Sequence, residues 1–205
     1  SLFFGRPDLQ LFESADGRSR MSDYLLKLAN SAADIGASVL VFGSPTNRRK
    51  GDLSKSEADS IAIDFFGELS LKIEEFNVVI AIEPNPTAYL ADYLLCPSEV
   101  VDFLTRLKCK NIRMNFDLAC SVLGNEDPVS MLQNSIEFVA HIHVSEPNLE
   151  PISKLTMPHR EFAQTIHQNS HLLEGVRVSM EMRDPIPNTD LVSESIAIFK
   201  EIYEK

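Results

Sequence analysis

The sequence contains few cysteines and no spacing that would make them a structural framework. Only three occur, Cys96, Cys109 and Cys120, and none of them belongs to a Cys-x-x-Cys pair. An odd number of widely separated cysteines is a poor basis for a disulfide network and fits a reducing compartment. Zinc-finger spacing is also absent, so neither a disulfide scaffold nor a small zinc-stabilised domain is expected.

Long apolar runs and targeting signals are also missing. No apolar run approaches the roughly 20 residues that a membrane-spanning helix needs. The first residues, Ser-Leu-Phe-Phe-Gly-Arg-Pro, lack the basic region and the long apolar region of a secretory signal peptide. We therefore expect a cytoplasmic protein with no membrane partner.

Positive charge is scarce in this chain. Lys and Arg together number 19 against 30 Asp and Glu, which gives a formal net charge of −11. Binding to nucleic acid requires clustered Lys and Arg, so we do not expect a nucleic-acid partner. The remaining composition, 44% hydrophobic and 24% charged over 205 residues, is that of a globular protein. No linker or charge block divides the chain, so we expect one domain over residues 1–205.

Short apolar runs alternate with longer amphipathic stretches along the whole chain. The runs are too short for helices and rich in Val, Ile or Phe, which predicts buried parallel strands. They lie at 2–5, 38–43, 78–83, 112–117, 139–144 and 176–181. Helices are predicted between and after them, at 22–35, 54–76, 97–107, 128–134, 158–168 and 189–203. This alternation indicates an α/β fold with a parallel sheet, either doubly wound or a barrel. No Gly-x-Gly-x-x-Gly or P-loop motif follows any strand, which disfavours the nucleotide-binding forms of the doubly wound sheet.

Four of the predicted strands carry a potential metal ligand at or near their carboxyl end. These residues are Glu83, Asp117, His143 and Glu181. The carboxyl ends of parallel strands meet on one side of the fold, so the four side chains are expected to lie together. Three clustered acids repel one another, and a divalent cation removes that conflict. Oxygen-rich ligation with one His suits Mn²⁺ or Mg²⁺, with Co²⁺ or Zn²⁺ also compatible.

Several short motifs carry a resemblance to a known family. They are Ile-Glu-Pro-Asn-Pro at 82–86, Asn-Phe-Asp at 115–117, His-Ile-His-Val-Ser-Glu at 141–146 and Ser-Met-Glu-Met at 179–182. In this order they resemble the xylose isomerase-like TIM barrels, the sugar and sugar-phosphate isomerases and epimerases. The segment Val-Phe-Gly-Ser-Pro-Thr-Asn-Arg-Arg at 41–49 is similar to a strand-end loop of the same family.

The resemblance implies an incomplete (β/α)8-type TIM barrel of six β/α units that lacks the first two. It implies Glu83, Asp117, His143 and Glu181 as ligands of a divalent metal ion, with Glu83 and Glu181 also acting as the catalytic acid/base pair. The substrate would be a small sugar, polyol or sugar phosphate. Because an open sheet exposes two edges, we also expect a homodimer that covers the gap.

Other polar residues near strand ends are candidates for substrate contacts. They are Arg6, Asn47, Arg48, Asn85, Tyr89, Glu146, Asn148 and Arg183. Asn115 lies two residues before Asp117 and is expected to point the same way as a supporting donor. His141 is expected to be a hydrogen-bonded histidine deeper in the barrel.

Two positions depart from the family pattern. Cys120 stands where family epimerases place a histidine, and Leu149 stands where they place an arginine. These departures keep two alternatives open, a polyol dehydratase of the inosose type and a catalytically inactive scaffold that binds sugar or metal. A metal-dependent apurinic endonuclease shares the fold, but its larger number of His ligands and the DNA it binds fit this acidic, His-poor chain badly.

Overall fold

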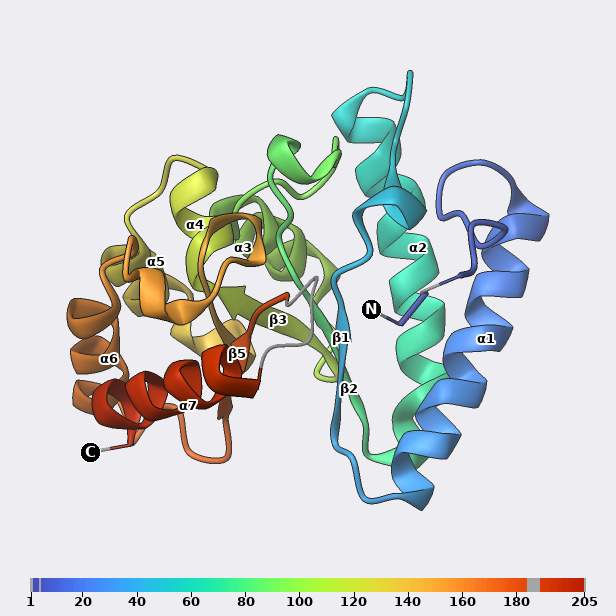
Figure 1. Ribbon diagram of the computed structural model, residues 1–205. Helices are drawn as coiled ribbons and strands as arrows, with labels where there is room; N and C mark the ends of the chain where they lie inside the picture. The colour runs from blue at the N-terminus through green and yellow to red at the C-terminus, as the bar shows by residue number, and fades with distance from the viewer. Residues whose placement is uncertain (1, 4, 184–188, 205) are drawn as a thin grey trace.

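The computed structural model describes residues 2–3, 5–183 and 189–204, and its centre is a parallel sheet of five strands in sequential order. The strands are β1 (Val39–Phe42), β2 (Val79–Ile82), β3 (Ile112–Asp117), β4 (Val139–Ser145) and β5 (Arg177–Glu181). Each strand pairs with the next one along the chain, which is the winding of a TIM barrel rather than of a doubly wound sheet. The sheet curls into a half-barrel, so that β1 also approaches β4 (Figure 1).

Helices lie on the outside of this sheet and connect its strands. The α-helices are α1 (Ala15–Asp34), α2 (Lys55–Ile73), α3 (Pro97–Leu107), α4 (Leu118–Leu123), α5 (Pro128–Ser135), α6 (His159–Gln168) and α7 (Thr189–Tyr203). Short 3-10 turns are η1 (Pro45–Arg48), η2 (Glu74–Phe76), η3 (Thr87–Tyr89), η4 (Ile136–Phe138), η5 (Pro147–Leu149) and η6 (Ile152–Lys154). Figure 1 shows α1 and α2 beside β1 and β2, with α6 and α7 at the other end of the sheet.

Local sequence signals explain where the helices begin. Ser14 caps α1 by accepting a hydrogen bond from the Gly17 backbone, which starts this helix seven residues before the predicted position. Ser54 and Glu57 form a reciprocal capping box at the start of α2. Helix α4 was not predicted. Its N-cap is Asp117, whose side chain accepts from the backbone N–H of Cys120.

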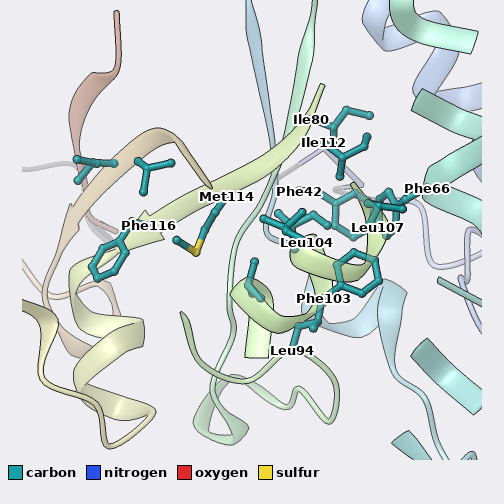
Figure 2. Close-up of a cluster of buried hydrophobic side chains, with 14 of the residues drawn as sticks. Phe42, Phe66, Ile80, Leu94, Phe103, Leu104, Leu107, Ile112, Met114 and Phe116 are labelled. Atoms are coloured by element: carbon teal, nitrogen blue, oxygen red, sulfur yellow. The ribbon is translucent and has the colours of Figure 1, made fainter. Parts of the chain in front are cut away.

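The core lies between the convex face of the sheet and the helices. Alternate strand residues point outward, and those of β2 and β3 that do so are apolar, with Ile80 and Met114 fully buried. Figure 2 shows this layer, in which Phe66 of α2 packs against Phe42 of β1 and Phe103 of α3. The opposite face of β3, β4 and β5 carries polar side chains toward the barrel interior, and the functional residues follow from that alternation.

The predicted first strand at 2–5 is not formed by the residues described there. Residues 2, 3 and 5 lie in turns, and residue 4 falls outside the described residues. Phe3 buries its ring against Phe42 at a centroid distance of 5.0 Å, and Gly5 adopts a left-handed conformation with φ of 72°. The apolar character of this segment therefore serves side-chain packing on β1, and the described sheet has five strands instead of six.

Within the described residues, every helix is too short or too polar to cross a lipid bilayer.

The aromatic layer gives a test of the fold. Phe66 is 1% exposed and packs edge-on against Phe42, Phe65 and Phe103. Phe66→Ala is expected to lower the free energy of unfolding by about 3–5 kcal/mol, because it leaves a cavity in a close-packed core. Leu71→Ala on the same helix is the control, since Leu71 is 75% exposed and its loss should change stability by under about 0.5 kcal/mol. Urea denaturation measures both, and equal effects of the two variants would contradict this packing.

Candidate metal centre

Four strand ends bring their side chains to one point on the carboxyl side of the sheet. Glu83 follows β2 directly, Asp117 ends β3, and Glu181 ends β5. His143 lies in β4, where it is the register partner of Asp117. One ligand atom from each of the four residues lies within 4.8 Å of the others. The parallel register therefore assembles three carboxylates and one imidazole from segments far apart in the sequence.

Glu83 is held by donors on every side of its carboxylate. Its Oε1 accepts from Asn115 Nδ2 at 2.6 Å and lies 2.8 Å from His143 Nδ1, while Oε2 accepts from Asn85 Nδ2 at 3.2 Å. Burial by itself would raise the pKa of Glu83, but His143, Asn85 and Arg48 together hold it below its ordinary value. Glu83 is therefore an ionised carboxylate in a buried position.

Asp117 has a different environment and a different proton affinity. Its carboxylate accepts from Ser145 Oγ at 2.7 and 2.9 Å and from the backbone N–H of Cys120 at 2.7 Å. Burial, together with the nearby charge of Glu83, raises the pKa of Asp117 to about 7 despite these donors. The repulsion expected among the clustered acids thus acts mainly by raising the pKa of Asp117.

His143 neutralises part of this negative charge. Its Nδ1 lies 2.8 Å from Glu83 Oε1 and 3.2 Å from Glu181 Oε2. Burial would lower the pKa of His143, but its interactions with Glu181 and Glu83 outweigh burial and raise it to about 10. A proton on Nδ1 sits at the point where two carboxylates converge, which is where a cation would bind.

These four residues fit a divalent metal ion by their chemistry and spacing. Carboxylate oxygens and an imidazole nitrogen are ordinary ligands for such ions. Donor atoms that all lie within 4.8 Å of one another can coordinate a single ion without rearrangement of the strands. Asn115 and Ser145, which donate to Glu83 and Asp117, orient two of the ligands from behind.

A cavity of about 350 Å³ opens above these ligands. Of the residues predicted to contact substrate, Asn85, Tyr89, Asn148 and Arg183 line it. Gly43, Pro45, Cys120 and Leu149 complete its wall together with Glu83, Asp117 and Glu181. The two positions that depart from the family pattern, Cys120 and Leu149, therefore both face the cavity. Burial and the charge of Asp117 raise the pKa of the Cys120 thiol well above its usual value.

The other four predicted substrate contacts lie away from this cavity. Arg6 forms an ion pair with Asp8 at 2.7 Å and stacks over the ring of Tyr24. Asn47 is buried and donates to the backbone carbonyls of Arg6 and Leu9, so it fastens the N-terminal segment to the loop after β1. Both side chains are used for packing and not for contact with the cavity.

Arg48 and Glu146 are also buried, each in its own network. Arg48 is 2% exposed, donates to the backbone carbonyl of Glu83 and lies over the ring of Phe42. Burial lowers the pKa of its guanidinium to about 10, which leaves it charged behind the metal centre. Glu146 is 1% exposed and bonds to His159 and Thr156. Sequence position placed these residues near the site, but only the side-chain directions show that they do not line the cavity.

His141 lies one layer deeper than His143, as expected. Its Nε2 lies 2.8 Å from Ser179 Oγ, and burial together with the neighbouring His143 lowers its pKa to about 4. It is a neutral, hydrogen-bonded histidine in the barrel interior.

Sequence reasoning missed two supporting residues. Ser145 lies two positions after His143 on the same face of β4, so the alternation of side chains along a strand could have identified it. Gly43 is the other one. A Cβ at this position would overlap the carboxylate of Glu83, so only glycine leaves room for that side chain. A glycine at a strand end was visible in the sequence, but the carboxylate beside it was not.

Similarity to known proteins agrees with this architecture. The sequence profile of the xylose isomerase-like TIM barrel family matches residues 11–202, and the chain belongs to that family. No curated protein sequence matches it.

Solved structures with the same fold include enzymes of more than one chemistry. The apo form of 3-keto-D-glucoside 4-epimerase from E. coli superposes with a TM-score of 0.82 at 12% identity, covering 95% of this chain and 76% of that one. D-psicose 3-epimerase crystallised with D-fructose gives 0.80 at 12% identity, covering 97% and 76%. A family 2 AP endonuclease from Brucella melitensis gives 0.74 at 14%, covering 91% and 70%. At these identities the similarity establishes the fold, and the activity has to be argued from the site.

Gly43 provides a test of the ligand geometry. Gly43→Ala is expected to weaken Mn²⁺ binding by about tenfold or more, because the added methyl group displaces the Glu83 carboxylate. Gly67→Ala is a matched control, since a Cβ there meets no atom within 4 Å. Calorimetric titration measures both affinities. Equal Mn²⁺ affinity of the two variants would contradict the close approach of residue 43 to Glu83.

Metal binding should also depend on pH in a defined direction. A metal ion requires His143 and Asp117 without their protons, and their pKa values of about 10 and about 7 mean that near neutrality His143 is protonated and Asp117 is about half protonated. Affinity is therefore expected to rise as pH rises from about 6 to about 8, with protons released on binding. Titrations in buffers of different ionisation enthalpy measure the released protons, and a pH-independent affinity would contradict the assignment of these ligands.

Proposed function

We propose that this protein is a divalent-metal-dependent isomerase or epimerase of a small sugar or sugar phosphate. The observation that carries the proposal is the convergence of Glu83, Asp117, His143 and Glu181 at the carboxyl ends of four neighbouring strands. In this proposal they hold Mn²⁺ or Mg²⁺, and Co²⁺ or Zn²⁺ are compatible with the same donors.

The reaction needs a base on one side of the substrate carbon and an acid on the other. We assign these roles to Glu83 and Glu181, since both contribute a carboxylate oxygen to the cluster and both line the cavity. One carboxylate removes the proton next to the substrate carbonyl, and the other returns a proton to complete epimerisation or isomerisation. The bound ion would supply positive charge to stabilise the negative charge that develops on the substrate oxygens.

The remaining polar wall suits recognition of a hydroxylated substrate. Asn85 and Asn148 carry amide groups that both donate and accept, and Tyr89 contributes a hydroxyl. Arg183 is the cationic side chain among the described residues of the wall. In the proposed enzyme these residues contact the substrate hydroxyls, and Arg183 is placed to meet an anionic group such as a phosphate.

Two related functions use the same site. A polyol dehydratase would share the four ligands and the acid/base pair. A non-catalytic scaffold would bind metal or sugar without turnover. The thiol of Cys120, which lines the cavity where family epimerases place a histidine, is the reason to test this alternative. The expected homodimer also remains part of the proposal, since β1 and β5 each pair with one neighbour in the described sheet.

The acid/base assignment is tested by Glu181→Gln. This variant keeps the shape of the side chain and leaves the fold intact, but it removes the ability to take a proton and weakens metal binding. Exchange of the substrate hydrogen with solvent should therefore fall by about 100-fold or more at saturating Mn²⁺. The measurement is deuterium incorporation by NMR in D₂O with Mn²⁺ and a panel of ketoses, aldoses and inososes. Glu174→Gln is the control, because Glu174 is exposed and lies before β5.

Each outcome has a defined meaning. Exchange unchanged in Glu181→Gln would defeat the assignment of this residue. Loss of water from an inosose would identify the dehydratase, and bound metal with no exchange on any substrate would favour the scaffold.

A further inference from the structure

Glu146 begins a buried chain of hydrogen bonds that lies outside the cavity. Its side chain is 0% exposed, and Oε1 lies 2.8 Å from His159 Nε2. On the other side of the imidazole, His159 Nδ1 lies 2.9 Å from the hydroxyl oxygen of Tyr203. The chain thus joins the end of β4 to the first residue of α6 and the last residue of α7.

The chemistry of these three groups determines which atom donates in each hydrogen bond. Burial lowers the pKa of His159, so the imidazole is neutral and one ring nitrogen donates while the other accepts. A carboxylate can only accept, so Nε2–H donates to Glu146 and the Tyr203 hydroxyl donates to Nδ1. Every member of the chain is satisfied, and removal of one hydroxyl would leave a buried nitrogen without its donor.

Glu146 also joins the two ends of the loop that follows β4. Its Oε1 accepts from the backbone N–H of Thr156 at 2.8 Å, and its Oε2 accepts from the Thr156 hydroxyl. The backbone carbonyl of Glu146 accepts from the N–H of Leu149 at 3.0 Å. One buried side chain therefore closes the segment 147–155 at its base.

The closed segment has a strained backbone. Asn148, Leu149 and Leu155 have positive φ angles of 59°, 58° and 49°. Asn adopts this region readily, but in leucine the Cβ makes it sterically unfavourable. Such conformations persist only where surrounding contacts enforce them, and the bonds of Glu146 to Thr156 and His159 are contacts of that kind.

This strained segment forms part of the cavity wall. Asn148 and Leu149 both line the cavity. The Asn148 backbone N–H donates to the Tyr89 hydroxyl at 3.0 Å, and the Leu149 carbonyl accepts from the Arg183 N–H at 2.8 Å. The position of the segment therefore also sets where Tyr89 and Arg183 meet the cavity.

We propose that Glu146, His159 and Tyr203 are positioning residues that hold segment 147–155 against the cavity and so determine substrate affinity. They act through Asn148 and Leu149 and touch none of the four metal ligands in the described contacts. The effect on substrate affinity rests on the proposed function, whereas the effect on the segment itself does not.

The test compares Tyr203→Phe with Tyr24→Phe. Tyr24 likewise donates its hydroxyl, in its case to the backbone carbonyl of Leu2, and it lies far from segment 147–155 in the sequence. Tyr203→Phe is expected to speed amide hydrogen exchange in residues 147–156 by about tenfold, while exchange in α2 stays unchanged. Tyr24→Phe should leave exchange in 147–156 as it is. Mass spectrometry of peptides from each region makes the measurement.

A second variant and two further readouts separate the possible outcomes. Thr156→Val removes one donor to Glu146 at an exposed position, so it is expected to fold and to speed exchange in the same residues. Mn²⁺ affinity should stay within about twofold for both variants. For any sugar of the panel that the unaltered protein turns over, KM of both variants should rise by about fivefold or more, while kcat stays within about twofold.

Unchanged exchange in 147–156 for both Tyr203→Phe and Thr156→Val would overturn the proposal. A fall in kcat with unchanged KM would also overturn it, because that pattern belongs to a group acting on the chemical step. Faster exchange together with no turnover on any sugar would leave the positioning role supported and count against the proposed function alone.

Discussion

The structure depends on how negative charge is compensated where neighbouring strands end. Glu83 and Asp117 are nearly inaccessible to solvent, and Glu181 joins them at the same point. Burial of like charges this close together is unfavourable unless a positive charge separates them. His143 provides that charge in the form of a proton on Nδ1, between Glu83 and Glu181. The same arrangement explains why a divalent ion fits there, since such an ion would replace the proton and would also neutralise the third carboxylate.

The rest of the fold supports this compensation from several directions. Asn115 and Ser145 occupy inward positions on β3 and β4 and donate to the two buried acids. Gly43 leaves space for the Glu83 carboxylate, and the first turn of α4 gives Asp117 a backbone donor. The buried side chain of Arg48 donates to the main-chain carbonyl of Glu83, so its positive charge lies next to this residue. Successive side chains of a strand point to opposite faces of the sheet. One face of these strands is therefore buried in the apolar core, and the other carries polar side chains into the barrel interior.

The end of β4 and the residue directly after it have separate roles. His143 and Ser145 point toward the metal centre, while Glu146 turns into the protein and bonds to α6 through His159. This reversal occurs within a single residue because successive strand side chains point to opposite sides. One short stretch of sequence thus provides a candidate ligand, a hydrogen-bond donor to another candidate ligand and the proposed anchor of the adjacent cavity wall.

The sequence by itself determined the alternation of parallel strands with helices and the candidate ligands at the strand ends. Short apolar runs identify parallel strands, and a metal-binding residue type recurs at or near the end of four of them. Glu83, Asp117 and Glu181 could therefore be selected as candidates without coordinates. The tertiary structure alone decided the direction of the other polar side chains. Arg48 and Glu146 follow strands in the sequence, as Asn85 and Arg183 do, yet Arg48 and Glu146 are buried in networks whereas Asn85 and Arg183 line the cavity. The apolar segment at 2–5 packs its Phe3 ring on β1 without entering the sheet. Loop residues lack the fixed period of a strand, so their orientation follows from contacts with distant residues, and a linear pattern contains no information about those contacts.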